Sequence, residues 1–96
     1  METKITLRFV GSLHNIIGKN KITLKLDGEK TLKEIIGILV DKFPETKRTI
    51  VDPELEDPRP NTLIIVNGRE ISVLKGLETI IKNGDEVIFV PVSHGG

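Results

Sequence analysis

Residues 31–44, TLKEIIGILVDKFP, predict a single amphipathic helix whose two ends are both marked in the sequence. Thr31 and Glu34 form a capping-box pattern, in which each side chain accepts a hydrogen bond from a backbone N–H of the other residue. Pro44 ends the helix, because the residue before a proline is disfavoured from the α-helical region. The apolar residues between these signals recur at helical spacing: Leu32, Ile35, Ile36, Leu39, Val40 and Phe43. A helix with one apolar face is expected to lie on a sheet.

Segments with the character of β-strands lie on both sides of this helix. Residues 5–10 and 22–26 alternate between apolar and polar side chains, which is typical of half-buried strands. Residues 62–66 form a third apolar segment, and Asn67-Gly68 after it predicts a tight hairpin, because a type I′ turn needs positive φ at both positions. The two remaining strands are expected at residues 69–71 and from Glu86 onward.

The connections between these elements are expected to be largely irregular. Residues 11–21 predict a long hairpin connection, and residues 76–82 predict a tight helical turn. Residues 45–61 are polar and hold three prolines, so we expect mostly loop there, with Ile50 and Val51 anchoring a short helical turn.

The order of these elements predicts an α+β fold, a mixed four- to five-stranded sheet packed on one main helix. If the first and last strands are central neighbours, they run parallel, which is the β-grasp or ubiquitin-like architecture. We expect residues 1–92 to form a single domain and residues 93–96 to form a flexible C-terminal tail that leaves from the middle of the sheet.

The composition argues against several classes of protein. The 96 residues include 14 basic and 14 acidic side chains and carry no net charge, whereas nucleic-acid-binding modules normally show a basic excess. There is no cysteine, and His14 and His94 lie far apart in sequence and do not suggest a metal site. No apolar stretch approaches the roughly 20 residues that span a bilayer. We therefore expect a cytoplasmic protein with no metal, nucleic-acid or membrane partner.

The third and last strands are apolar on both faces, although one helix covers only one face of a sheet. Some of these side chains should therefore form an exposed patch, and such patches often mark partner surfaces. We expect the partner-binding residues to be Leu63, Ile65, Phe89, Val92 and His94. The alternative is that the segment 45–61 folds over the patch.

The sequence closes on Gly95-Gly96, directly after the apolar segment at 87–92 and Ser93-His94. Glycine loses more backbone freedom on ordering than other residues and adds no side chain to a core, so a terminal pair suggests a thin, bendable tail. Such a tail fits a channel too narrow for side chains. Gly95 would allow threading, and the Gly96 carboxyl would be the reacting group. The alternative is a frayed chain end.

The chain resembles the ubiquitin-like sulfur carriers, which include the small subunit of molybdopterin synthase, the thiamine sulfur carrier and the ubiquitin-related modifier. The resemblance is sharpest in residues 63–68 (LIIVNG), 83–87 (NGDEV) and 90–96 (VPVSHGG). Pro91-Val92 is similar to the molybdopterin-synthase type, whereas His94-Gly95-Gly96 is similar to the ubiquitin-related modifier.

The resemblance implies that the protein is a cosubstrate and not an enzyme. An E1-like adenylating partner would use ATP to convert the Gly96 carboxylate into an acyl adenylate. A sulfur donor protein would then supply the sulfur of a C-terminal thiocarboxylate. The acceptor would be the large subunit of molybdopterin synthase, in molybdopterin or tungstopterin biosynthesis, or a tRNA thiolase. The carrier itself would bind no cofactor.

Two other functions remain open at this point. The activated Gly96 of a protein modifier would form an isopeptide bond with target lysines on other proteins. A plain interaction domain would bind partners through its surface alone and would not need Gly95 and Gly96.

Overall fold

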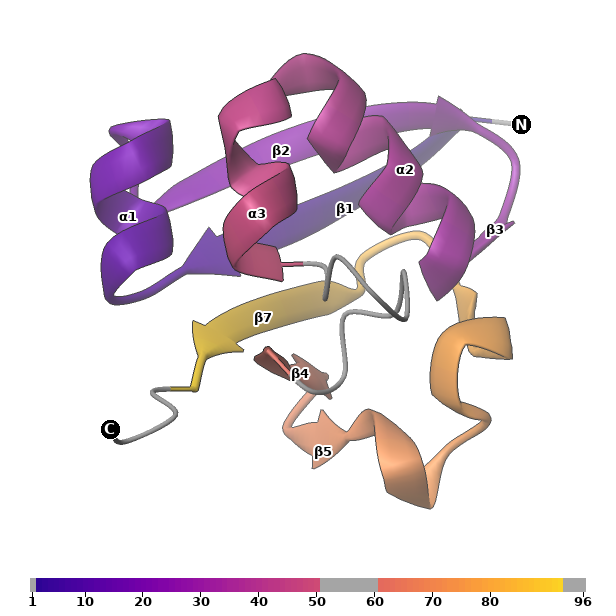
Figure 1. Ribbon diagram of the computed structural model, residues 1–96. Helices are drawn as coiled ribbons and strands as arrows, with labels where there is room; N and C mark the ends of the chain where they lie inside the picture. Colours follow the sequence, from indigo (N-terminus) through magenta and orange to yellow (C-terminus); the bar gives the residue numbers. More distant parts are fainter. Residues whose placement is uncertain (1, 51–60, 93–96) are drawn as a thin grey trace.

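The structure, a computed structural model, describes residues 2–50 and 61–92 and contains one main sheet (Figure 1). The strands follow the order β2-β1-β7-β4-β5 across this sheet. Their bounds are β1 (Glu2–Phe9), β2 (Lys21–Asp27), β4 (Thr62–Val66), β5 (Arg69–Glu70) and β7 (Glu86–Pro91). Two short strands, β3 (Lys30–Thr31) and β6 (Ile80–Ile81), pair separately as a second sheet.

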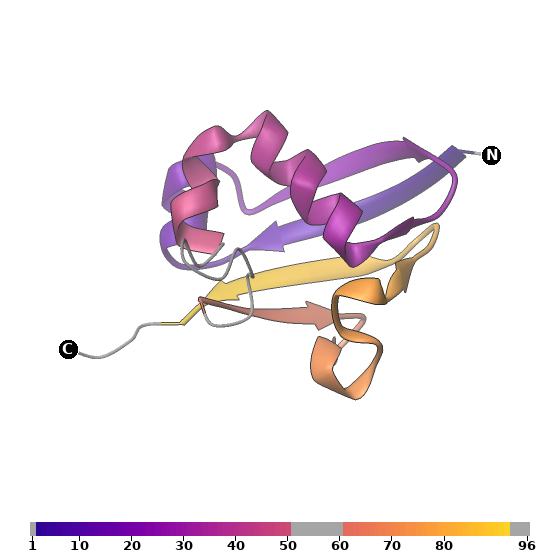
Figure 2. The ribbon, with the colours of Figure 1, turned by 45° about the vertical axis from the view of Figure 1, so that its right-hand side comes forward.

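Helices and helical turns occupy the connections. They are α1 (Ser12–Ile17), α2 (Leu32–Lys42), α3 (Lys47–Ile50) and the 3₁₀ turns η1 (Pro44–Thr46), η2 (Ile71–Val73) and η3 (Gly76–Glu78). Figures 1 and 2 show α2 and α3 over one face of the sheet. No helix in the described ranges is long and apolar enough to cross a membrane.

The first and last strands are central neighbours. β1 pairs in parallel with β7, with Arg8 opposite Ile88 and Phe9 opposite Phe89, whereas β2 and β4 run antiparallel to their neighbours. The predicted α+β, β-grasp fold is therefore confirmed, with five strands in the mixed sheet. β7 runs along the middle of the sheet toward the tail (Figure 2).

The main helix begins at the predicted capping box. The Glu34 backbone N–H donates to Thr31 Oγ1 at 3.2 Å, and the Thr31 backbone N–H donates to Glu34 Oε1 at 3.0 Å. Hydrogen bonds from the Thr31 backbone and hydroxyl hold the pKa of the Glu34 carboxyl below its usual range. At the other end Phe43 is the C-cap and Pro44 opens η1, as the sequence predicts.

The core lies between α2 and the sheet face that it covers. Phe9 and Phe89 stack there with ring centroids 6.0 Å apart and an angle of 16° between the ring planes. Four side chains of α2 are buried against these strands: Leu32, Ile35, Ile36 and Leu39. Burial of this apolar stripe holds the helix on the sheet, because about 25 cal/mol is gained for each Å² of apolar surface removed from water.

Two connections contain more helix than the sequence predicts. Instead of a plain hairpin connection, residues 12–17 form α1, which buries Leu13 and Ile17 in the core and lies between Gly11 and Gly18. Gly18 takes φ +81° at the C-cap, a left-handed conformation that suits glycine. In the second connection, α3 with its buried Ile50 is the short helical turn that the sequence predicts, and η1 with its buried Thr46 is additional.

Candidate functional site

The two faces of β4 and β7 are both apolar but differ in exposure. Ile64 and Phe89 are fully buried on the helix-covered face. The prediction that Phe89 belongs to the exposed partner surface is therefore wrong. The reason is its position directly opposite Phe9, whose side chain alternates with the exposed Arg8 and points into the core.

The other face carries a cluster that we call the outer patch, formed by Leu63, Ile65, Ile88 and Val90. Leu63 lies directly opposite Val90, and Ile65 lies directly opposite Ile88, so the four side chains are cross-strand neighbours on one face. Leu63 is 37% exposed, and the other three are intermediate between buried and exposed. The accessible face of β7 thus carries Ile88 and Val90, which were not among the predicted site residues.

An ion pair borders the outer patch on the β1 side. Arg8 Nε donates to Glu86 Oε2 at 2.5 Å, and both side chains are well exposed to solvent. An exposed pair of this kind contributes about 0 to 1 kcal/mol to stability. The ion pair therefore adds little to the stability of the fold, and it forms a polar border beside the apolar cluster.

The described chain leaves the sheet at Val92, which we call the tail root. The Val92 backbone N–H donates to the Asn61 carbonyl oxygen at 2.9 Å, so the chain remains attached to the sheet up to this residue. The Val92 side chain is 42% exposed. Of the predicted site residues, Leu63, Ile65 and Val92 are accessible here. Phe89 is buried, and His94, Gly95 and Gly96 lie outside the described residues, as do residues 51–60 of the segment predicted as an alternative cover.

A hollow of about 510 Å³ adjoins the tail root, and we call it the tail-root groove. Its walls come from the start of α1, from α3, from the start of β4 and from the end of β7. They are formed by Gly11, Ser12, Arg48, Thr49, Asn61, Pro91 and Val92. Gly11 has φ +60°, which lets the chain turn from β1 into α1 beside Pro91.

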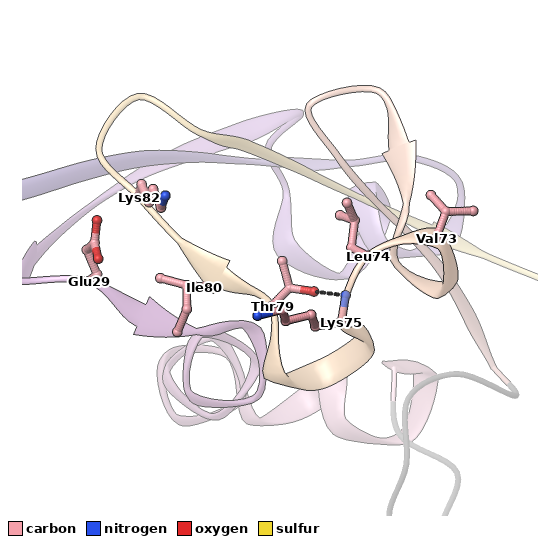
Figure 3. Close-up of a pocket in the computed structure, with 7 residues that line it drawn as sticks. All are labelled: Glu29, Val73, Leu74, Lys75, Thr79, Ile80 and Lys82. Carbon is pink, nitrogen blue, oxygen red and sulfur yellow. Dashed lines mark hydrogen bonds between the residues drawn. The ribbon is translucent and has the colours of Figure 1, made fainter.

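A second hollow, of about 630 Å³, lies toward the opposite end of β7 and is shown in Figure 3. It is lined by Glu29, Val73, Leu74, Lys75, Thr79, Ile80 and Lys82. The Lys75 backbone N–H donates to Thr79 Oγ1 at 3.1 Å and holds the loop that carries Val73 and Leu74 (Figure 3). β7 separates this remote groove from the tail root by about 20 Å, at about 3.3 Å for each residue of the strand.

Structural comparison defines the class of protein. The solution structure of small archaeal modifier protein 1 from Methanosarcina acetivorans superposes with a TM-score of 0.84 and 25% sequence identity, covering 100% of this chain and 99% of that one. The sheet order, the main helix and this likeness are those of a ubiquitin-like β-grasp protein.

Sequence comparison identifies the family. Small archaeal modifier protein 3 of Haloferax volcanii is 29% identical over 94 residues, covering 96% of this chain and 99% of the relative. A predicted sulfur carrier protein of Archaeoglobus fulgidus is 38% identical over 80 residues, covering 80% of this chain and 88% of the relative. The family description Urm1 (Ubiquitin related modifier) matches residues 4–96. The chain therefore belongs to the ubiquitin-related modifier family of ubiquitin-like sulfur carriers and modifiers.

Proposed function

We propose that this protein is a sulfur carrier that bears the sulfur as a thiocarboxylate on Gly96. A carboxylate is a poor electrophile, because its negative charge repels attack and oxide is a bad leaving group. An E1-like partner therefore joins a Gly96 oxygen to the α-phosphorus of ATP and releases pyrophosphate. A sulfide equivalent from a donor protein then displaces AMP from the acyl carbon and leaves the thiocarboxylate.

The chain's own part in this sequence is to present the tail and to dock. It has no cysteine, so the sulfur comes from outside, and ATP binds to the partner and not to the carrier. The outer patch offers an apolar surface with a polar rim, the usual anatomy of a protein–protein interface. Gly95 carries no side chain and passes a narrow channel.

One observation carries the proposal: the central strand of the sheet leads, through Pro91 and Val92, from the outer patch to the glycine pair. A partner that docks on Leu63 and Val90 stands next to the tail root. Membership of a family of sulfur carriers and modifiers supports the same conclusion.

The test is intact-mass analysis after incubation with the activating enzyme, ATP and a sulfur source. We expect the mass gain of one sulfur replacing one oxygen, located on Gly96. The matched control is a chain that lacks Gly95 and Gly96 but keeps the outer patch. If this shortened chain gains sulfur equally well, or if the full chain gains none, the proposal is wrong.

The acceptor of the sulfur belongs to one of two classes. We propose either the large subunit of a molybdopterin synthase, in molybdopterin or tungstopterin biosynthesis, or a tRNA thiolase. Single-turnover transfer from the purified thiocarboxylate to each acceptor separates the two, since only the true acceptor should consume it.

Protein modification is the second candidate function, favoured by relatives that are named modifiers. It shares the adenylation step but ends in an isopeptide bond between Gly96 and a lysine of another protein. Trypsin cuts this chain after Lys82 and not after His94, so modification would leave the remnant 83–96 on lysines of cellular proteins, and its detection by mass spectrometry would support this function. If the remnant is absent under every growth condition tested, the carrier function stands alone.

A further inference from the structure

If the proposed function holds, the tail is so short that an enzyme binding its Gly96 carboxyl must also contact the tail root. Four residues separate Val92 from the end of Gly96. An extended chain advances at most about 3.6 Å for each residue, so the reacting carboxyl lies within about 14 Å of Val92. An enzyme that binds this carboxyl in its active site therefore lies close to Val92. The surface around the active site must then contact the residues around Val92.

The tail-root groove is the hollow that this surface meets. Val92 and Pro91 form one wall, and the hydrogen bond from Val92 to Asn61 fixes that wall to the sheet. Arg48 and Thr49 of α3 also line the groove. Because α3 is anchored through the buried Ile50, the position of Arg48 beside the tail root is set by the core and not by a surface loop.

The charge that the described residues bring to the groove comes from Arg48. Among the described residues that line it, Arg48 is the one that carries a charge, and its side chain is exposed. Within the part of the chain that the structure describes, no carboxylate forms an ion pair with it. A guanidinium presents a planar set of N–H donors that matches a carboxylate in a bidentate arrangement. The complementary partner surface is therefore acidic.

We propose that the tail-root groove receives a carboxylate side chain of the activating enzyme, held by Arg48. The inference rests on the proposed function and adds a recognition residue outside the outer patch and the glycine tail. Arg48 is a positioning residue, because it contacts the enzyme and not the reacting atoms. Its contribution should appear in the concentration of carrier that half-saturates the enzyme, whereas the rate of the bound complex should change little.

The experiment measures pyrophosphate release by the activating enzyme at increasing carrier concentration, for the full-length chain and three variants. Arg48→Glu should raise KM at least about tenfold with kcat nearly unchanged, and most of this effect should disappear at high salt. Arg48→Lys should recover part of the loss, since it restores the charge without the bidentate geometry. Lys75→Glu makes the same charge change in the remote groove and should behave like the unmodified chain.

Each other outcome contradicts the inference. Equal KM values for Arg48→Glu and Lys75→Glu would show that only net charge matters. Faster activation of Arg48→Glu would show that the groove holds the chain's own tail carboxylate instead of an enzyme side chain. Thermal unfolding of the variants checks that the exposed Arg48 is not needed for folding. If the unmodified chain releases no pyrophosphate, the proposed function fails first.

Discussion

The two faces of β4 and β7 hold the same kinds of side chain but differ in how far these are buried. Ile64 and Ile65 are consecutive residues of one strand, yet Ile64 is fully buried beneath the helices and Ile65 stays partly accessible in the outer patch. A partly accessible isoleucine removes less apolar surface from water than a fully buried one, so Ile65 contributes less to folding than Ile64. The difference shows that the inner face forms the core, and under the proposed function the outer face is the one left for recognition.

The largest effect in this comparison of the two faces is expected on the inner face, at Ile64. Ile64→Ala removes buried methyl and methylene groups and leaves a cavity, so the free energy of unfolding should fall by about 2 to 5 kcal/mol. In a domain of this size, that corresponds to a drop in Tm of at least about 8 °C. Denaturant or thermal unfolding measures it. A loss below about 1 kcal/mol would mean that the inner face is not the core.

A substitution of the next residue, Ile65, tests the outer face. Ile65→Ala should lower the free energy of unfolding by no more than about 1 kcal/mol, because the side chain is already partly hydrated. Binding to the activating enzyme should nevertheless weaken about tenfold, as expected when an apolar residue at the centre of an interface is truncated. Titration calorimetry with the enzyme measures this effect. Unchanged binding would remove the outer patch from the interface.

The smallest predicted effect lies outside both faces, at the start of α2. The lowered pKa of Glu34 means that its charged form stabilises the fold above the usual glutamate pKa of about 4.3, and that this stabilisation is lost as the pH falls through the lower folded value. Glu34→Gln should therefore be less stable than the unmodified chain near neutral pH, with the difference vanishing in acid. Unfolding measured from pH 7 to pH 3 tests this.

The matched control is Glu45→Gln, an exposed glutamate beyond the other end of the helix. If both variants lose stability in parallel over the whole pH range, the capping box has no part in the acid sensitivity. Neither change should alter binding by the activating enzyme, since neither residue belongs to the outer patch.

Much of the fold was predictable because its signals are local. The capping box at Thr31, the stop at Pro44 and the Asn67-Gly68 turn each depend on a few neighbouring residues, and all three lie where the sequence indicates. The helix α1 was missed because its signal consists of only three apolar residues, Leu13, Ile16 and Ile17, within a six-residue segment.

The site was predicted only in part, for a different reason. In β4 and β7 both faces are apolar, so alternation does not tell which side chains point outward. The orientation is set by pairing with a distant strand: Phe9 points inward, and Phe89 lies directly opposite it in the parallel register. Aligning β7 with β1 in the parallel register would have predicted that Ile88 and Val90 lie on the outer face.

The parallel pairing of β1 with β7 also governs when the sheet is completed. Arg8 and Glu86 lie 78 positions apart in sequence, so the centre of the sheet closes a loop that holds most of the chain. Bringing such distant residues together costs chain entropy before the contacts between them can form. This cost slows folding. A chain still being synthesised therefore lacks both the centre of the sheet and half of the outer patch, because Ile88 and Val90 belong to the last strand.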